Sequence, residues 1–254
     1  MRRFNRALAA AQLPVLLPQI VAVRKEIPRL PEALGLREGL VPAPGTPASA
    51  IYSASAPEPL RLLIMGDSTA LGVGAPSLDQ ALPGRIADGL AEGIGRSVAW
   101  RAIGRSGADT PAVIARYLPL AIDREWDLIV LPLGTNDTMH LVSPWRHRKN
   151  LRTIIKQLRK RSPEAPILLS AQPAFRQFPS LPEPLRSRLA GLADELEADA
   201  GVIIGEFEHV LMTPRPDSYP GDFFASDGFH PSAAGYAAWA GRIVAQATPL
   251  LAER

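Results

Sequence analysis

The sequence predicts an α/β fold: a three-layer α/β/α sandwich around a central sheet of five parallel strands. Two observations from residue 60 onward lead to this prediction. Short apolar runs alternate with longer amphipathic segments. The runs are nearly continuous in apolar residues, which is typical of strands buried on both faces. Strands that are separated by helices pair in parallel through right-handed crossovers.

The elements follow one another in a regular order, and no internal repeat interrupts them. The predicted strands are Leu60–Met65, Val98–Ile103, Leu128–Leu133, Ile167–Ala171 and Val202–Ile204. The predicted helices are Gly84–Ile94, Pro111–Leu120, Trp145–Arg161, Glu183–Ala200 and Ser232–Leu250. We therefore divide the 254 residues into an N-terminal arm, 1–59, and an α/β domain, 60–254.

The arm begins with an apolar stretch, Leu8–Val23, that contains two prolines and two glutamines. It is shorter than the roughly 20 predominantly apolar residues of a transmembrane helix. It has the basic start of a signal peptide, but no small-x-small site lies at its end. We interpret it as an amphipathic or kinked segment that either lies on a membrane or packs over the mouth of the functional site. This favours a cytoplasmic or peripherally membrane-associated protein over a secreted one.

The rest of the arm, Pro28–Pro59, carries seven prolines. Proline removes a backbone donor and fixes φ, so this segment can form neither one long helix nor a central strand. An extended wrap or linker is the expected conformation.

Composition excludes several classes of function. The absence of cysteine excludes disulfides, thiolate metal sites and a cysteine nucleophile. The net charge of +3 is small for this length, and no basic surface pattern with interleaved aromatic residues is present, so we expect no nucleic-acid partner. One basic run, 146–161, is interpreted as the solvated face of a helix, with a docking surface for anionic lipid or an acidic substrate as the alternative.

Glycine and small polar residues follow three of the strands and also precede the last helix. The four segments are "GDS" at 66–68, "IGRSGADT" at 103–110, "LGTNDT" at 133–138 and "SDGFHP" at 226–231. Chemistry gathers at the carboxyl ends of parallel strands, so we expect these segments to open on the same edge of the sheet. The simplest alternative is structural, because Asp and Ser cap helices and Gly makes turns.

One of the four histidines has an evident partner. Asp227 precedes His230 by three residues, and a carboxylate that accepts from imidazole Nδ1 leaves Nε2 available as a base. The alternative is a helix start in which Asp227 is a cap and His230 is incidental. His147 lies in the basic run and is expected to be solvated, and no sequence neighbour suggests a partner for His140 or His209.

Serine chemistry needs a hydroxyl, a base and donors for the developing oxyanion. Ser68 offers the hydroxyl, and Asp227 with His230 offers the base. The backbone N–H of Gly107 and the side chain of Asn136 can supply the donors, since both follow strands that are expected to neighbour the first.

In these segments the sequence resembles the SGNH, or GDSL-like, serine hydrolases. Residues 66–68 resemble the first block of the family, 106–110 the second, 134–137 the third and 227–231 the last. The resemblance covers residues 60–250. Two departures are Thr69 in place of the leucine of the family name, and Ala102 where the second block usually has an asparagine.

The resemblance implies an SGNH hydrolase-like, flavodoxin-like fold with Ser68 as nucleophile, His230 as base and Asp227 orienting it. It also implies an oxyanion hole of Ser68 N–H, Gly107 N–H and Asn136, and no metal or organic cofactor. Substrates in the family include acyl esters, thioesters, lysophospholipids and acetylated sugars, so we expect a small-molecule or lipid-like ester.

The expected activity is therefore that of a serine esterase, and three alternatives are kept. An acyltransferase could use the same site, and a non-catalytic carbohydrate- or lipid-binding module could share the fold. An α/β-hydrolase would use Ser106 as nucleophile, although Ala108 stands where its G-x-S-x-G elbow needs a glycine.

Overall fold

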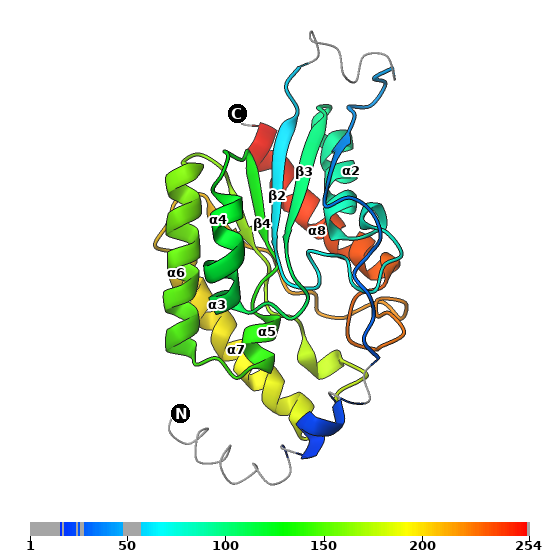
Figure 1. The fold of residues 1–254 in the computed structure, drawn as a ribbon, viewed down its shortest axis with the longest axis vertical. Coiled ribbons are helices and arrows are strands. Elements are labelled where there is room, and N and C mark those ends of the chain that lie inside the picture. The colour runs from blue at the N-terminus through cyan, green and yellow to red at the C-terminus, as the bar shows by residue number, and fades with distance from the viewer. Residues whose placement is uncertain (1–15, 17, 24, 26–27, 48–56, 253–254) are drawn as a thin grey trace.

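A computed structural model describes residues 16, 18–23, 25, 28–47 and 57–252 of the chain (Figure 1). Within this part the sheet has six strands in the order β1-β3-β2-β4-β5-β6. They are β1 (Glu38–Val41), β2 (Leu60–Gly66), β3 (Val98–Gly104), β4 (Leu128–Leu131), β5 (Ile167–Leu169) and β6 (Val210–Met212). Strands β2 to β6 pair in parallel, and β1 is an antiparallel edge strand on β3.

Helices cover both faces of the sheet, so the predicted α/β class and its layers are confirmed. One face carries α2 (Leu82–Ile94) and α8 (Ala233–Ala252). The other face is covered by α3 (Thr110–Ala112), α4 (Leu118–Ala121), α6 (Pro144–Arg161) and α7 (Leu185–Ile204). The short α5 (Thr135–Met139) lies at the lower edge of the sheet in Figure 1.

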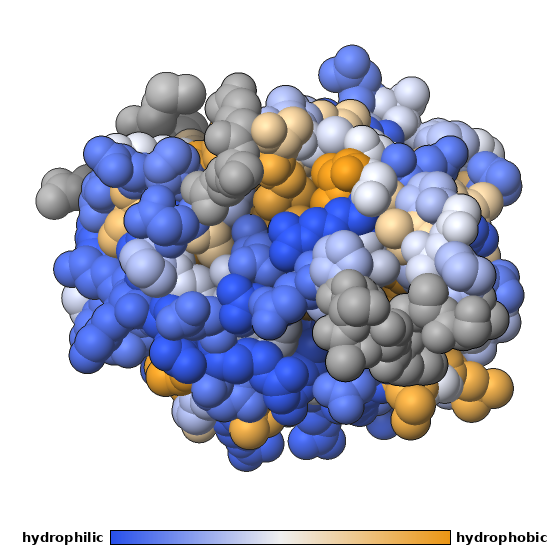
Figure 2. Space-filling model, turned by 90° about the horizontal axis from the view of Figure 1, so that it is seen from above, coloured by the Kyte–Doolittle hydropathy of each residue, from blue (hydrophilic) through white to orange (hydrophobic). Residues whose placement is uncertain are grey.

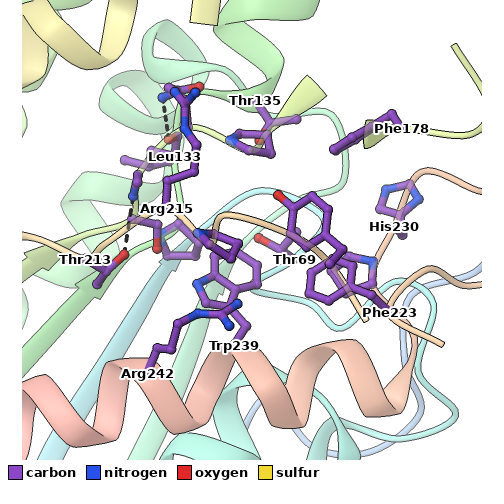
Figure 3. Close-up of a pocket in the computed structure, with 18 of the residues that line it drawn as sticks. Thr69, Leu133, Thr135, Phe178, Thr213, Arg215, Phe223, His230, Trp239 and Arg242 are labelled. Carbon is purple, nitrogen blue, oxygen red and sulfur yellow. Dashed lines mark hydrogen bonds between the residues drawn. The ribbon is translucent and has the colours of Figure 1, made fainter. Parts of the chain in front are cut away.

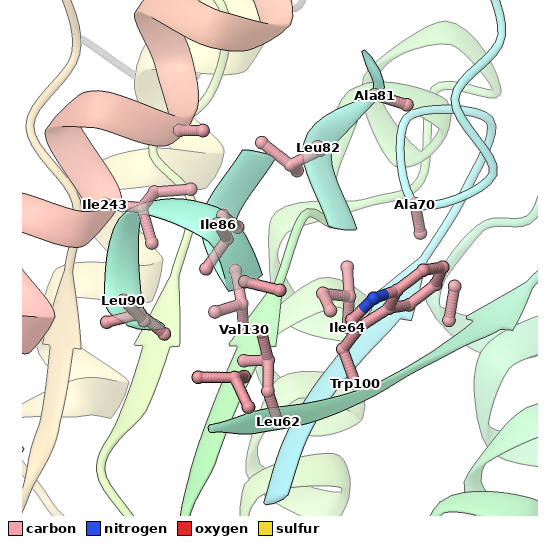
Figure 4. Packing of buried hydrophobic residues seen from close by; sticks show 14 of the residues in the cluster. Leu62, Ile64, Ala70, Ala81, Leu82, Ile86, Leu90, Trp100, Val130 and Ile243 are labelled. Carbon is pink, nitrogen blue, oxygen red and sulfur yellow. The ribbon is translucent and has the colours of Figure 1, made fainter. Parts of the chain in front are cut away.

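The strand pleat explains the two hydrophobic layers. On β2, Leu62 and Ile64 point to the α2 and α8 side, whereas Leu63 and Met65 point to the other. All four side chains are fully buried, as period-2 alternation in a doubly covered strand requires. Figure 4 shows the first layer, in which Leu62 and Ile64 meet Ile86 and Leu90 of α2 and Ile243 of α8.

The predicted strand at Val202–Ile204 is wrong, because these residues form the end of α7. Val202 is 61% exposed and Ile203 is fully buried, which continues the helical spacing of the preceding apolar residues. The outermost parallel strand is β6, which begins six residues beyond Ile204, at Val210. A second difference is β1, which lies inside the proline-rich segment. It occupies a sheet edge, the position that such a segment tolerates.

The segment predicted as one helix over Pro111–Leu120 divides into α3, a π-helical stretch (Val113–Tyr117) and α4. Pro119 cannot donate a backbone hydrogen bond and its ring crowds the preceding turn, which disfavours a regular α-helix through this point. The chain accommodates it by widening the preceding turn, where Leu118 N donates to the Val113 carbonyl. The remaining predicted helices are present within a few residues of the expected boundaries.

The parallel strands all end at the lower edge of the sheet in Figure 1, where their connecting loops meet. Figure 2 shows the opposite end of the molecule, whose visible surface is mainly hydrophilic. None of the described helices combines the length and the apolar composition that crossing a membrane requires.

Tyr236 of α8 links the last helix to the loop after β2. Its side chain is fully buried, and its hydroxyl donates to the Val73 carbonyl at 2.8 Å. Replacing Tyr236 with Phe leaves this carbonyl buried and unpaired, so we expect a loss of about 1–3 kcal/mol in the free energy of unfolding. Urea denaturation monitored by circular dichroism measures this loss.

Tyr117→Phe is the matched control, because the Tyr117 hydroxyl makes no hydrogen bond in the described part of the chain. It should change the free energy of unfolding by less than about 0.5 kcal/mol. Equal stability losses in the two variants would show that the Tyr236 hydrogen bond contributes nothing specific.

Candidate active site

The turn after β2 presents Ser68 at the carboxyl edge of the sheet. The carboxylate of Asp67 accepts hydrogen bonds from the backbone N–H and the hydroxyl of Thr69, both at 2.9 Å. The Ser68 carbonyl accepts from Val73 N at 3.0 Å. These bonds fix the turn on both sides of Ser68, which is 6% exposed.

The loop before α8 brings His230 and Asp227 to this serine. His230 Nε2 lies 3.0 Å from Ser68 Oγ, and His230 Nδ1 lies 2.6 Å from Asp227 Oδ2. The other carboxylate oxygen of Asp227 accepts the backbone N–H groups of Phe229 and His230, each at 2.9 Å. The three residues that the sequence analysis selected therefore form one continuous chain of hydrogen bonds.

Close packing holds the two segments together. Gly74 has φ +99°, and a Cβ at this position would collide with the carbonyl oxygen of Pro231. Glycine therefore permits the loop after Ser68 to lie directly against the loop that carries His230. Ala225 N donates to the His230 carbonyl at 2.8 Å, which closes the second loop on itself.

The two carboxyl groups near Ser68 have opposite electrostatic environments. Burial raises the pKa of Asp67 above its ordinary value, and the hydrogen bonds from Thr69 offset this effect only in part. Burial also opposes ionisation of Asp227. There, however, the hydrogen bonds from His230 and from two backbone N–H groups outweigh it and hold the pKa below its ordinary value. Of the two groups, Asp227 is therefore the one whose surroundings favour the ionised form.

The two predicted oxyanion donors line the same groove as Ser68. Gly107 follows β3 with φ +80°, and Asn136 lies in α5. Both line a groove of about 1820 Å³ that also contains Ser68 and His230. In the described part of the chain, no protein group accepts a hydrogen bond from the backbone N–H of Ser68 or of Gly107. Asn136 Nδ2 instead donates to Asp67 Oδ2 and to the Ala108 carbonyl, both at 3.1 Å.

A buried polar cluster joins the turns that carry these donors. Asp137 of α5 accepts the backbone N–H of Thr110 at 3.0 Å and its hydroxyl at 2.5 Å. Both side chains are fully buried. His140, for which the sequence offered no partner, lies 3.1 Å from Asp109. The cluster fixes the Gly107 turn relative to α5.

The expectation that His147 is solvated is wrong. Its side chain is 1% exposed, and Nδ1 lies 3.2 Å from Asp137 Oδ1. A sequence signal was available, since His147 shares helical spacing with Leu151 and Leu158, both of which are buried. The remaining basic residues of α6 agree with the interpretation as a helix face, and several form ion pairs: Arg148–Asp199, Arg152–Glu206 and Arg161–Glu125.

The N-terminal arm reaches the same groove. Ile20, Val23 and Arg29 line it, and Leu16 and Val23 are buried against aromatic and aliphatic side chains of the domain. Gln19 accepts from Leu185 N at 3.1 Å. Of the two arrangements that the sequence left open, the described residues adopt packing over the groove. Residues 1–15 lie outside the described part, and membrane contact through 8–23 stays a prediction.

Ser106, the nucleophile of the α/β-hydrolase alternative, does not form a comparable arrangement. It is exposed, its backbone N–H donates to Glu32 at 3.4 Å, and no hydrogen bond joins its hydroxyl to a histidine among the described residues. Nor does the described part contain a cluster of three or more His, Asp or Glu side chains placed to bind a metal ion.

A second cavity adjoins Ser68 and His230 on the side of α8 (Figure 3). It measures about 730 Å³ and extends past Thr69 to Trp239 and Arg242. No local sequence pattern indicates this pocket, because its walls come from segments far apart in the chain that only the fold brings together.

Comparison with known proteins identifies a family and a relative. The model described as the GDSL-like Lipase/Acylhydrolase family matches residues 64–238. The "GDSL-like esterase Rv1075c" of Mycobacterium tuberculosis is 27% identical over 231 residues, which cover 88% of this chain and 72% of that protein.

Solved structures resemble the fold. The crystal structure of TesA superposes with a TM-score of 0.60 at 22% identity, covering 75% of this chain and 99% of that one. The lipase/acylhydrolase from Enterococcus faecalis gives a TM-score of 0.57 at 19% identity, covering 75% and 96%. Phospholipase A1 from Streptomyces albidoflavus gives 0.54 at 18% identity, covering 75% and 100%.

The environment of Asp227 predicts a pH-dependent contribution to stability. Because its pKa is lower in the folded state than the ordinary 3.8, the unfolded chain binds this proton more readily. The contribution is complete above that value and is lost as the pH falls through the folded-state pKa. At pH 7 we expect Asp227→Asn to lower the free energy of unfolding by about 1.5–3 kcal/mol, the usual range for hydrogen bonds to charged groups.

Urea denaturation of both proteins between pH 7 and about pH 3 tests this expectation, and the difference between them should shrink below about pH 4. Asp222→Asn, which removes an exposed carboxylate of the same loop, controls for the change in net charge. A stability difference for Asp227→Asn that is constant with pH would contradict the assignment.

Proposed function

The chain belongs to the GDSL-like lipase/acylhydrolase family and is a carboxylic ester hydrolase, and we propose that Ser68 is its nucleophile, with His230 as general base and Asp227 as the residue that orients it. The observation that carries this proposal is the hydrogen-bonded chain from Ser68 Oγ through His230 to Asp227. A serine hydroxyl is a weak nucleophile until an adjacent base takes its proton.

The first half of the reaction acylates the enzyme. Ser68 Oγ attacks the ester carbonyl carbon while His230 Nε2 takes the hydroxyl proton. Asp227 accepts a hydrogen bond from the Nδ1–H of His230, which fixes the tautomer and stabilises the imidazolium that forms. As the tetrahedral intermediate collapses, the bond to the alcohol oxygen breaks and His230 returns the proton to the departing alcohol.

Three donors are available to the negative oxygen of that intermediate. The backbone N–H groups of Ser68 and Gly107 have no protein acceptor in the described residues, which leaves them available to an oxyanion. The third donor is Asn136 Nδ2. One of its two hydrogens points to the Ala108 carbonyl, and the oxyanion would accept a hydrogen bond from this same hydrogen. The other hydrogen of the amide is accepted by Asp67, the residue before Ser68. Hydrogen-bond donors that are already in position before the reaction stabilise the negative charge as it develops on the carbonyl oxygen.

The second half of the reaction releases the acid. Water attacks the acyl-enzyme carbonyl, His230 takes its proton, and the Ser68 oxygen leaves with that proton. The groove and the pocket both open on Ser68, so they can hold the two substituents of the scissile carbonyl. Apolar walls in both cavities favour small-molecule or lipid-like esters, in agreement with the lipase and phospholipase names of structural neighbours.

Ser68→Ala is expected to lower kcat for p-nitrophenyl ester hydrolysis by about 10⁴-fold or more, because the acyl-enzyme can no longer form. A fluorophosphonate probe should label the wild-type protein at residue 68 and fail to label the variant. Circular dichroism verifies that the variant is folded.

Ser106→Ala is the matched control, since it removes a hydroxyl from the neighbouring turn. It should retain nearly all of the activity. Near-wild-type turnover by folded Ser68→Ala protein, or loss of activity only in Ser106→Ala, would overturn the assignment of the nucleophile.

Asn136→Ala is expected to lower kcat by about 10²- to 10³-fold, the usual effect of removing one oxyanion donor. The KM should change far less, because the hydrogen bond strengthens only as charge develops on the oxygen. Steady-state kinetics on the same esters separates the two parameters. A variant whose KM rises while kcat is preserved would make Asn136 a substrate-binding residue.

A further inference from the structure

The pocket on the α8 side of Ser68 has an unusual distribution of polar groups. About half of the residues that line it are aromatic residues or prolines, including Phe178, Tyr219, Phe223, Trp239, Pro132 and Pro214. No aspartate or glutamate is found among the described residues that line it. Two arginines, Arg215 and Arg242, also line the pocket (Figure 3).

The two arginines differ in their partners. Arg215 lies 2.6 Å from Asp194 and 2.8 Å from Glu197, so its charge is balanced within the protein. Arg242, on α8, forms no ion pair in the part of the chain that the structure describes. Its Nε atom is buried and has no hydrogen-bond acceptor. Arg242 as a whole is only partly buried, but its Nε–H has lost water without gaining an acceptor, which is unfavourable.

A second polar group in the pocket lacks a partner. Ser170 follows β5 and is 4% exposed, and its hydroxyl oxygen is buried without a hydrogen bond. Ser170 and Arg242 come from different elements, yet both line the same cavity. Buried polar groups in native proteins are nearly always hydrogen-bonded, so two such groups facing one apolar cavity indicate a ligand with a polar end.

We propose that this pocket binds the acyl part of the ester and that the preferred acyl chain carries a carboxylate at its far end, which pairs with Arg242. The inference rests on the proposed function, since it assumes that Ser68 attacks the carbonyl of that acyl chain. The substrates would then be half-esters of dicarboxylic acids. A carboxylate matches the planar fork of a guanidinium, and apolar surroundings strengthen the ion pair.

The acyl chain, rather than the alcohol, is assigned to this pocket because of the order of events. The acyl group stays covalently attached to Ser68 until water hydrolyses it, whereas the alcohol must leave first. The pocket is the smaller and more enclosed of the two cavities at Ser68. The wider groove beneath the N-terminal arm suits a group that diffuses away.

Two series of p-nitrophenyl esters test the proposal. One series has acyl chains that end in a carboxylate, from glutarate to sebacate, and the other has the unbranched neutral acyl chains of equal carbon number. The quantity of interest is the ratio of kcat/KM between the two esters of each pair. We expect the wild-type protein to favour the carboxylate ester by about tenfold or more at the chain length that reaches Arg242.

Arg242→Gln should lower kcat/KM for that ester by about 10- to 100-fold and leave its neutral counterpart within about threefold. Arg242→Lys keeps the positive charge without the planar fork and should retain part of the preference. Arg146→Gln, on the exposed surface of α6 and outside both cavities, is the charge-matched control and should leave the ratio unchanged.

The outcomes separate the two proposals. Equal ratios for the wild-type protein and Arg242→Gln would overturn this inference. In that case, neutral-ester activity that depends on Ser68 would leave the proposed function intact. If Arg242→Gln fails to fold, Arg242→Lys provides the test. A kcat/KM ratio in Arg242→Lys that equals the wild-type ratio overturns the inference, and a partly reduced ratio supports it.

Discussion

Burial of the parallel sheet on both faces is the constraint on which the rest of this molecule depends. With Leu62 and Ile64 in one hydrophobic layer and Leu63 and Met65 in the other, β2 has no face left for polar chemistry. Polar side chains can appear only where a strand ends. Ser68 is two residues beyond the end of β2, and Gly107 and Asn136 follow β3 and β4, the two strands that flank it in the sheet.

The two carboxyl groups beside Ser68 show how environment separates similar residues. Asp227 meets the imidazole and two backbone N–H groups, which favour its charged form despite its burial. Asp67, one residue before Ser68, is buried among groups that compensate it less completely, and its role is to hold Thr69 and Asn136. One carboxylate is therefore favoured in its charged form and is hydrogen-bonded to His230, and the other stabilises the shape of the turn.

The sequence predicted the local parts of this arrangement well. Strand ends, turn glycines and the spacing of Asp227 and His230 are properties of short segments, so the fold class and the juxtaposition of these residues were accessible. The errors have tertiary causes. The apolar run Val202–Ile204 resembles a strand because three residues at the end of a helix are too few to show a helical period. The charged neighbours of His147 suggest a solvated side chain, whereas its helical spacing with Leu151 places it in the core.

Arg242 could not have been singled out from sequence, because its surroundings come from loops after β4, β5 and β6 and from the segment before α8. The position of the arm over the groove could not be predicted from the family resemblance either, because the arm lies outside residues 64–238, the part that the family model matches. The arm contributes Ile20 and Arg29 to the groove, and Glu32 accepts the backbone N–H of Ser106, next to Gly107. The Ser68 turn and the His230 loop thus lie within the region shared with relatives, whereas one wall of the groove and a contact to the Gly107 turn come from outside it. If the groove holds the departing alcohol, as proposed, selectivity for that alcohol can change through the arm while Ser68, His230 and Asp227 keep their places.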